Sequence, residues 1–340
     1  MNDIGQRAAL SRERLDAVRA LLERRGAPAA LLSTRRNVAW LTAGSDAHIV
    51  LSSETAVASL LVTRDAAVCI TQNIEAARLA EEELEGLGIE TVPVPWWESD
   101  AIDAEAARRT GAEPLDDDAI EPDLVPLRSV LAPLDRDRFA ELGRIGREAV
   151  TGALATIAED ATEDDLAAEL VGRLVGVRAP VVLVAADDRL TRFRHPLPKG
   201  ASIRRRVMLV LVAERWGLHV ALTRIRELEP PSGDLARRIQ AVGDVERAMH
   251  EATRVGATLG DVFLAAQEAY AAAGFPDEWR DHHQGGTIAY QGREVIATPG
   301  DETRIEAGMA FAWNPSIAGA KVEDTFVLED DGSRRLVTGG

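Results

Sequence analysis

Two adjacent histidines, His282 and His283, are followed by two glycines and then by the pair Arg293-Glu294. Imidazole nitrogens bind metal ions and exchange protons near neutral pH, and a guanidinium pairs with carboxylates. The combination is typical of an active-site wall. A metal centre, however, needs several ligands that converge on one point, and adjacent side chains in a strand point to opposite faces. The question is whether the rest of the chain supplies further ligands.

The N-terminal third alternates helical and strand patterns. Residues 11–25 have the apolar spacing of an amphipathic helix, and residues 73–88 predict a second helix that ends at glycines. Between them, short apolar runs at 28–34, 58–63 and 66–71 have the length of strands. This alternation predicts an α/β domain.

A segment rich in proline and acidic residues, 111–127, is a poor candidate for core and marks a domain boundary. A long helix is predicted to start near Asp135, and the run 207–224 predicts two strands joined by a turn. Two further helices and several C-terminal strands follow. We therefore expect two domains, 1–130 and 131–340, of class α/β (α+β).

The composition excludes several classes of function. The formal net charge of −17 argues against nucleic-acid backbones and anionic membrane surfaces as partners. One cysteine, Cys69, allows no internal disulfide and no cysteine-based zinc site. No apolar signal region and no apolar run of membrane-spanning length occurs, which favours a soluble, cytoplasmic protein.

Five segments, in the correct order, resemble the creatinase and Xaa-Pro aminopeptidase superfamily. They are TRRNVAWLTAG, DRFAELGRIGREA, HHQGG, AGMAFAWNPSI and AKVEDTFVLEDDG. The resemblance covers nearly the whole chain. It implies a creatinase-type N-terminal α/β domain, a pita-bread catalytic domain and a homodimer.

Peptidases of that superfamily hold two divalent metals with two Asp, one His and two Glu. Carboxylates suit this task because two adjacent dications require several anionic oxygens. In this sequence the five positions carry Val210 or Val212, Ala221, His283, Asn314 and Glu323. Because three carboxylates are missing, we expect no catalytic metal and no other cofactor.

Creatinase is the metal-free precedent in the superfamily. It hydrolyses a C–N bond of a guanidino compound by histidine acid/base chemistry, and its catalytic histidine precedes the hairpin. Here His195 lies at a similar place, so His195 and His283 are the candidate proton carriers. Glu323 is the third candidate catalytic residue, positioned to bind a substrate cation or to orient a water molecule.

The same resemblance suggests how a small-molecule substrate is held. Arg293, in a Gly-Arg-Glu that creatinase also has, is a candidate carboxylate clamp. Asn314 can donate and accept hydrogen bonds where the family has a Glu. The other candidate substrate-binding residues are His282, Tyr290, Trp313 and Arg194.

The leading hypothesis is a metal-independent hydrolase that cleaves an amide, amidine or guanidine C–N bond in a small polar nitrogen compound. The alternative is a catalytically inactive pita-bread protein that binds a peptide or small ligand. A metal-dependent Xaa-Pro peptidase is a third reading, which requires the missing carboxylates.

Overall fold

The computed structural model describes residues 2–339, and side-chain burial from residue 4 onward. The chain divides into two compact units. The first comprises the chain up to Arg128 together with Trp216–Leu218, and the second comprises Ser129–Arg215 and the chain from His219. None of the described helices is both long enough and apolar enough to cross a membrane.

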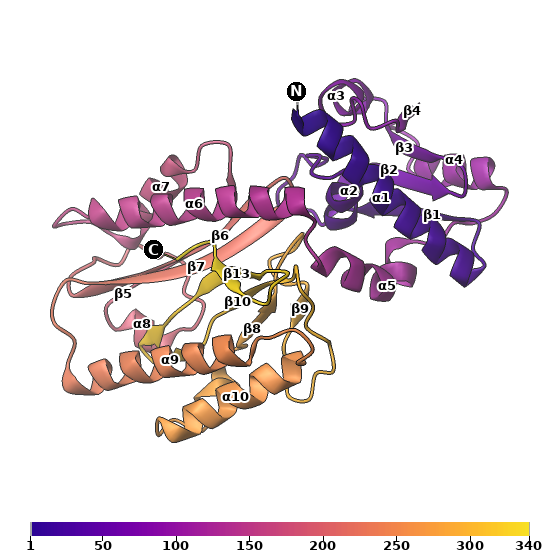
Figure 1. Cartoon of the computed structure of the whole chain (residues 1–340). Coiled ribbons are helices and arrows are strands. Elements are labelled where there is room, and N and C mark those ends of the chain that lie inside the picture. The colour runs from indigo at the N-terminus through magenta and orange to yellow at the C-terminus, as the bar shows by residue number, and fades with distance from the viewer. Residues whose placement is uncertain (1, 340) are drawn as a thin grey trace. The chain divides into compact units, whose positions relative to one another are not determined.

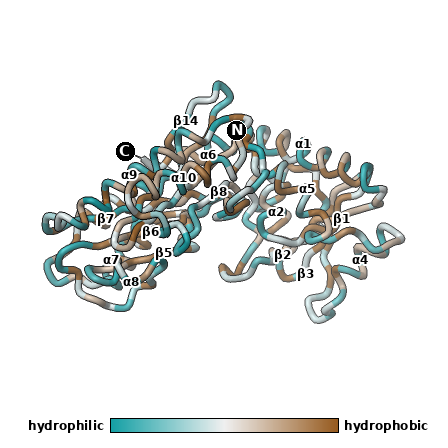
Figure 2. The backbone as a smooth tube through the Cα atoms, turned by 90° about the horizontal axis from the view of Figure 1, so that it is seen from below, coloured by the Kyte–Doolittle hydropathy of each residue, from teal (hydrophilic) through white to brown (hydrophobic). Residues whose placement is uncertain are grey.

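The first unit is built around a four-stranded sheet of order β1-β2-β3-β4 (Figure 1). β1 and β3 flank β2 in antiparallel fashion, whereas β4 runs parallel to β3. Its hydrophobic strands, such as β1, are seen as brown segments in Figure 2. The bounds are α1 (Asn2–Arg25), β1 (Ala29–Thr34), α2 (Arg35–Leu41), β2 (Thr55–Thr63), β3 (Ala67–Gln72), α3 (Ala76–Arg78), a π-helical turn (Leu79–Glu83), β4 (Glu90–Val94), α4 (Ala101–Thr110) and α5 (Asp117–Ser129).

The interpretation of 111–127 as a segment outside the core is wrong. Asp117–Ser129 form α5, and Ile120 and Leu124 of this helix are fully buried. These two residues are four apart and share one helix face. Pro122 and Pro126, also four apart, are exposed. The prolines that suggested a linker therefore lie on the solvent side of a packed helix.

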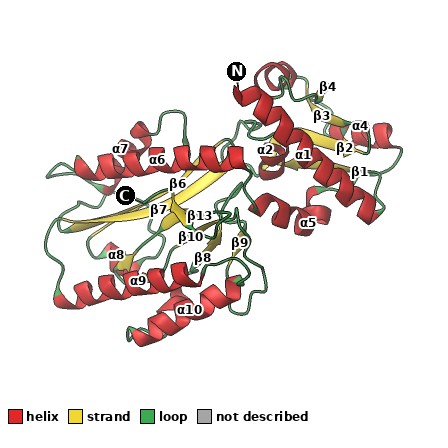
Figure 3. Ribbon diagram, viewed as in Figure 1, coloured by secondary structure: helices red, strands yellow, loops and turns green. Residues whose placement is uncertain are grey.

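The described residues of the second unit form three β-sheets, of which the smallest is the pair β11-β12. The two larger sheets lie between α6–α7 and α9–α10 (Figure 3). The first sheet has the order β5-β6-β7, and the second has the order β14-β13-β10-β8-β9. The helices are α6 (Pro133–Ala155), α7 (Glu163–Arg173), α8 (Arg189–Arg192), α9 (Gly233–Ala252), α10 (Leu259–Ala272) and a 3-10 turn (Glu278–Asp281). The strands are β5 (Arg178–Ala186), β6 (Arg206–Arg215), β7 (Leu218–Glu227), β8 (Gly285–Thr287), β9 (Val295–Ile296), β10 (Ala310–Trp313), β11 (Ser316–Ile317), β12 (Ala320–Lys321), β13 (Asp324–Leu328) and β14 (Arg334–Leu336).

The two faces of each sheet differ in what they contact. On the first sheet, Leu211 and Leu222 lie against Gly146 of α6. On the second sheet, Phe311 and Trp313 pack into a core cluster with residues of α9 and α10. Because side chains alternate along a strand, the neighbours of these residues point to the opposite, inner face. The candidate site residues lie on and around that inner face.

The glycines that follow the two histidines have a structural role. Gly285 has φ 99°, and a Cβ there would collide with the backbone of Ala312 on β10. A Cβ on Gly286 would collide with the backbone of Val295 on β9. Glycine at both positions lets β8 lie between its neighbours and fixes the backbone that carries His283.

Candidate active site

Three histidines from two distant segments lie side by side. His195 belongs to the loop between α8 and β6, and its neighbour Pro196 is anchored by a backbone hydrogen bond from Val184 (3.2 Å). The Nε2 atoms of His195 and His282 are 3.0 Å apart, a hydrogen-bonding distance. The His283 ring centroid lies 5.6 Å from that of His195 and 4.7 Å from that of His282.

The two adjacent histidines do not point to opposite faces. That expectation assumed a regular strand, but His282 closes the 3-10 turn and β8 begins only at Gly285. The two rings are therefore neighbours, tilted by 37°. In the described part of the chain, one ligand atom from each of the three histidines can be chosen so that all lie within 4.8 Å of one another.

The surroundings keep these histidines neutral. Burial, together with the charge of Lys321, holds the pKa of His282 at about 2. Burial and Arg293 lower the pKa of His283 to about 4. The pKa of His195 is also lowered, by burial first and by Lys321 next. Neutral imidazoles can accept a proton or bind a metal ion, and His195 is the one exposed to solvent.

Each of the two adjacent histidines has a hydrogen-bond partner through its Nδ1 atom. The Ser316 hydroxyl lies 3.1 Å from Nδ1 of His282, and the backbone N–H of Gly285 donates to Nδ1 of His283 at 3.3 Å. These contacts orient the rings. Ser316 was not among the sequence candidates, and its place two residues after Asn314 gave no signal of this role.

Glu323 lies fully buried between two cations. Its carboxylate accepts hydrogen bonds from Arg293 (2.7 Å) and from the Thr223 hydroxyl (2.7 Å), and Lys321 lies 3.2 Å away. Burial by itself raises the pKa of this group, but Lys321 and Arg293 outweigh it and lower the pKa to about 2. Glu323 is therefore an anion with three partners. Its partner Lys321, two residues earlier, was missed by the sequence analysis, although strand alternation places both on one face.

Asn314 lies on the inner face beside Glu323. Its neighbour Trp313 pairs with Gly285 on one side and Asp324 on the other, so the register sets Asn314 opposite Gln284 and Glu323. The Asn314 backbone N–H donates to the Gln284 carbonyl at 3.1 Å. Asn314 is 2% exposed, and its Oδ1 has no hydrogen-bond partner in the described part of the structure.

Three expected substrate-binding residues have structural partners instead. Trp313 is fully buried in the core against α9 and α10, and its indole N–H donates to Thr253 (2.9 Å). Tyr290 is buried, and its hydroxyl donates to Asp135 at 2.7 Å. Arg194 forms an ion pair with Glu278. The type of these side chains suggested a pocket wall, but the register and the ion pairs could not be read from the sequence.

Comparison with known proteins assigns the family. The model of metallopeptidase family M24 matches residues 137–330, and the creatinase/prolidase N-terminal domain model matches residues 14–132. The chain belongs to metallopeptidase family M24. This confirms the superfamily and the fold expected from the five sequence segments.

Individual relatives are similar to this M24 protein over different lengths. A probable dipeptidase PepE of Mycobacterium bovis is 30% identical over 124 residues, which span 34% of this chain and 32% of the relative. The structure of dipeptidase PepE from Mycobacterium ulcerans aligns with a TM-score of 0.77 at 20% identity, covering 98% of this chain and 96% of that one. The prolidase from Pyrococcus horikoshii aligns with a TM-score of 0.79 at 17% identity, covering 96% and 98%. Both structures share the fold.

At the five positions where the resemblance implies metal ligands, this M24 chain carries one histidine, one glutamate and three side chains without a charge. Val210 and Ala221 are buried and apolar, and Val210 packs in a hydrophobic cluster with Leu183 and Met208. Asn314 carries no charge. Both oxygens of Glu323 already have protein partners. Only His283 is left as an available donor, and dications require several anionic oxygens.

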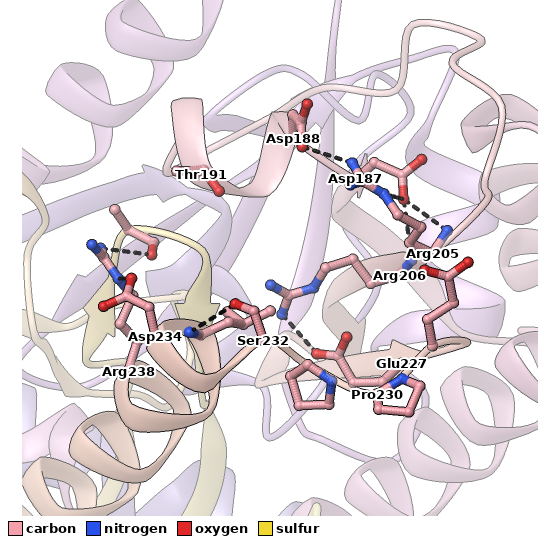
Figure 4. A pocket seen from close by; sticks show the side chains of 14 residues that line it. Asp187, Asp188, Thr191, Arg205, Arg206, Glu227, Pro230, Ser232, Asp234 and Arg238 are labelled. Atoms are coloured by element: carbon pink, nitrogen blue, oxygen red, sulfur yellow. Dashed lines mark hydrogen bonds and ion pairs between the residues drawn. The ribbon is translucent and has the colours of Figure 1, made fainter.

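A polar pocket of about 410 Å³ lies elsewhere in the second unit (Figure 4). Its charged side chains pair with one another: Arg206 with Glu227 (2.7 Å), Arg205 with Asp188 (2.8 Å), and Arg238 with Asp234 (2.8 Å). None of the candidate site residues lines it. The pocket is lined by a network of internal ion pairs, in contrast to the neutral histidine cluster.

Proposed function

We propose that this M24 protein hydrolyses a C–N bond in a small polar nitrogen compound by histidine acid/base catalysis, without a two-metal centre. The observation that carries the proposal is the 3.0 Å contact between Nε2 of His195 and Nε2 of His282, with His283 beside them. Two neutral imidazoles in contact share one hydrogen, so one ring accepts a proton while the other donates.

The proposed reaction is the addition of water followed by loss of an amine. Exposed His195 takes a proton from water as the oxygen attacks the carbon of the C–N bond. The histidine cluster, with His283 as the second proton carrier, then delivers a proton to the nitrogen, and the C–N bond breaks. An amide thus gives a carboxylic acid and an amine. The lowered pKa values of His195 and His283 keep both rings neutral and able to accept a proton, and a ring with a lowered pKa readily passes that proton on.

Glu323 and Arg293 act together in this proposal. Two nitrogens of Arg293 are engaged, by Glu323 and by the Gly292 carbonyl, while its Nε lies buried without a hydrogen-bond partner in the described structure. The free Nε is the donor that remains for an acceptor atom of the substrate, such as a carboxylate oxygen. Glu323 holds the guanidinium in place.

The first experiment is turnover of a panel of small amides and dipeptides by the wild type, His195→Ala and His283→Ala. The peptide bond is itself an amide, and the relative named a probable dipeptidase makes dipeptides reasonable first substrates. We expect both variants to lose about 10²- to 10⁴-fold in kcat/KM, the usual contribution of general acid/base catalysis. His219→Ala is the control. Full turnover in both variants would contradict the proposal, and no turnover of any compound by the wild type would favour a binding protein.

The three-histidine cluster also favours a second candidate, a hydrolase with a single divalent ion. Its ligand atoms all lie within 4.8 Å of one another, and three histidines are a known ligand set for catalytic zinc. In that case the ion would activate water. Activity that rises with added zinc or manganese and disappears with a chelator would support this candidate over the metal-free one.

The remaining parts of the proposal concern assembly and location. We propose a homodimer that works on a small molecule in the cytoplasm, with neither nucleic acid nor membrane as a partner. The net charge of −17 supports the last point. Sedimentation equilibrium of the full chain tests the dimer, and a monomer at micromolar concentration would contradict it.

A further inference from the structure

The unpartnered carbonyl of Asn314 calls for an explanation. Buried polar atoms in folded proteins nearly always have a hydrogen-bond partner, and leaving one without a partner is destabilising. Only 2% of the surface of Asn314 is exposed, and its Oδ1 has no hydrogen-bond partner in the described structure. Because this oxygen is an acceptor, the missing partner is an N–H or O–H group.

The register of β10 places the Asn314 side chain on the face of the sheet where the candidate site lies. Trp313 packs toward α9 and α10, so the next residue, Asn314, points to the opposite face. Glu323 stands across from it and is bonded to Thr223, on the inner face of the first sheet. An N–H group that reaches Asn314 therefore belongs to a molecule on the same inner face as Glu323.

The charges on that face disfavour a cationic ligand. Lys321 and Arg293 supply two positive charges, and Glu323 supplies one negative charge. Lys321 and Glu323 are buried and Arg293 is partly buried, and the interaction between charges is stronger there than in water. The sum is one uncompensated positive charge beside neutral histidines. A cation placed next to it would be repelled and would lose its hydration shell.

Taking the proposed hydrolase as given, we propose that its substrate is a neutral amide or urea rather than an amidine or guanidine. The charges of Lys321 and Arg293 make this selection, and Asn314 holds the substrate by accepting a hydrogen bond from its N–H. Amides and ureas offer an N–H donor without charge. Amidines and guanidines are cations at neutral pH and would face the excess positive charge of Lys321 and Arg293. Asn314 is thus a substrate-binding residue, and a change of charge at this position would alter the selection made by Lys321 and Arg293.

A matched pair of ligands tests this inference on the full chain. N-carbamoylglycine and guanidinoacetate both carry a carboxylate and have nearly the same shape, but the first has a neutral urea and the second a guanidinium cation. We expect isothermal titration calorimetry to show the urea binding at least about tenfold more tightly, a difference of about 1.4 kcal/mol. Equal or tighter binding of guanidinoacetate overturns the inference, as does the absence of binding by both compounds at millimolar concentration.

Two substitutions sharpen the test. Asn314→Asp keeps the shape and adds one negative charge, so the preference should move toward guanidinoacetate by about tenfold or more. Asn314→Leu removes the unpartnered acceptor, so we expect a higher melting temperature of the free protein together with weaker binding of the urea. Unchanged ligand preference in both folded variants overturns the role of Asn314. If the urea binds as expected but no amide is hydrolysed, the proposed function fails, and what remains is that this face binds a neutral N–H compound in preference to a cation.

Discussion

The two larger sheets of the second unit present different inner faces. On the first sheet, the central inner-face positions of β6 and β7 are Val210, Val212 and Ala221, with Thr223 as the polar residue next to them. On the second sheet, Asn314, Glu323 and the nearby Lys321 are polar and buried. The central positions of the first face carry no carboxylate, and the carboxylate of the second face, Glu323, has both oxygens bound to protein partners.

The difference between the two faces bears on which side chains can take part in catalysis. A two-metal centre needs carboxylates from both sheets, since neither sheet alone supplies enough anionic oxygens. In the proposed function, the apolar centre of the first sheet and the cation-bound Glu323 of the second leave proton transfer to the histidines, which come from loops rather than from the sheets. Loops held by a rigid scaffold often carry catalytic groups.

Putting carboxylates back on the first sheet should give the largest effect on stability. In the double variant Val210→Asp/Ala221→Asp, two unpaired charges enter a buried apolar face, which we expect to lower the free energy of unfolding by about 3–5 kcal/mol or more. Thermal melting with and without manganese is the measurement. Val181→Asp, at an exposed position of the same sheet, is the control. A manganese-induced recovery of the melting temperature would mean that the metal geometry is still present.

Removing the carboxylate from the second sheet should have the next largest effect. Glu323→Gln leaves Lys321 and Arg293 buried without an anion, and we expect a loss of about 3 kcal/mol in denaturant unfolding. Because Lys321 is one of the two cations, the double variant Glu323→Gln/Lys321→Met should recover part of that loss. Additive losses from the two substitutions would show that the residues do not act as a buried pair.

The pH profile of activity distinguishes the histidine cluster from an ordinary exposed histidine. The neutral form is the proton acceptor, so activity is complete above its pKa and is lost as the pH falls through it. Burial and Lys321 lower the pKa of His195 below the ordinary 6.5. We therefore expect the acid limb of kcat/KM to have its midpoint below pH 6.5, and Lys321→Met to move that midpoint upward. An acid limb above pH 7 would contradict this electrostatic account.

A smaller effect is expected at Tyr290, outside the inner face. Tyr290→Phe removes the hydrogen bond to Asp135 and should lower stability by about 1 kcal/mol without changing kcat or KM. Thermal melting and steady-state kinetics on the same preparation measure both quantities. A raised KM with unchanged stability would restore Tyr290 to the substrate-binding residues.

Strong periodic patterns in the sequence predicted the fold well. The hairpin at 207–224 forms as β6 and β7, and the long helix predicted to start near Asp135 forms as α6, because each depends on local spacing. The order of five family-like segments gave the superfamily. The helix at 117–129 was not predicted because its two prolines are typical of a linker. The four-residue spacing of Ile120 and Leu124 was the signal that indicated a helix.

The site was harder to predict because its contacts are between distant residues. His195 and His282 are 87 residues apart in sequence, and nothing in either segment shows that their rings touch. The partners of Glu323 come from β7, from the loop before β9 and from β12, so its charge state depends on the folded sheets. Trp313 could be assigned to core only once the register of β10 was known.

The most direct test of the account is the metal content per chain, measured by inductively coupled plasma mass spectrometry alongside activity. The protein should be purified without chelator and dialysed with zinc and manganese. We predict less than about a tenth of an equivalent of either metal on an active enzyme, because too few anionic ligands remain. About one equivalent in the wild type that is lost in His195→Ala and His283→Ala would contradict the metal-free account and establish a three-histidine metal centre.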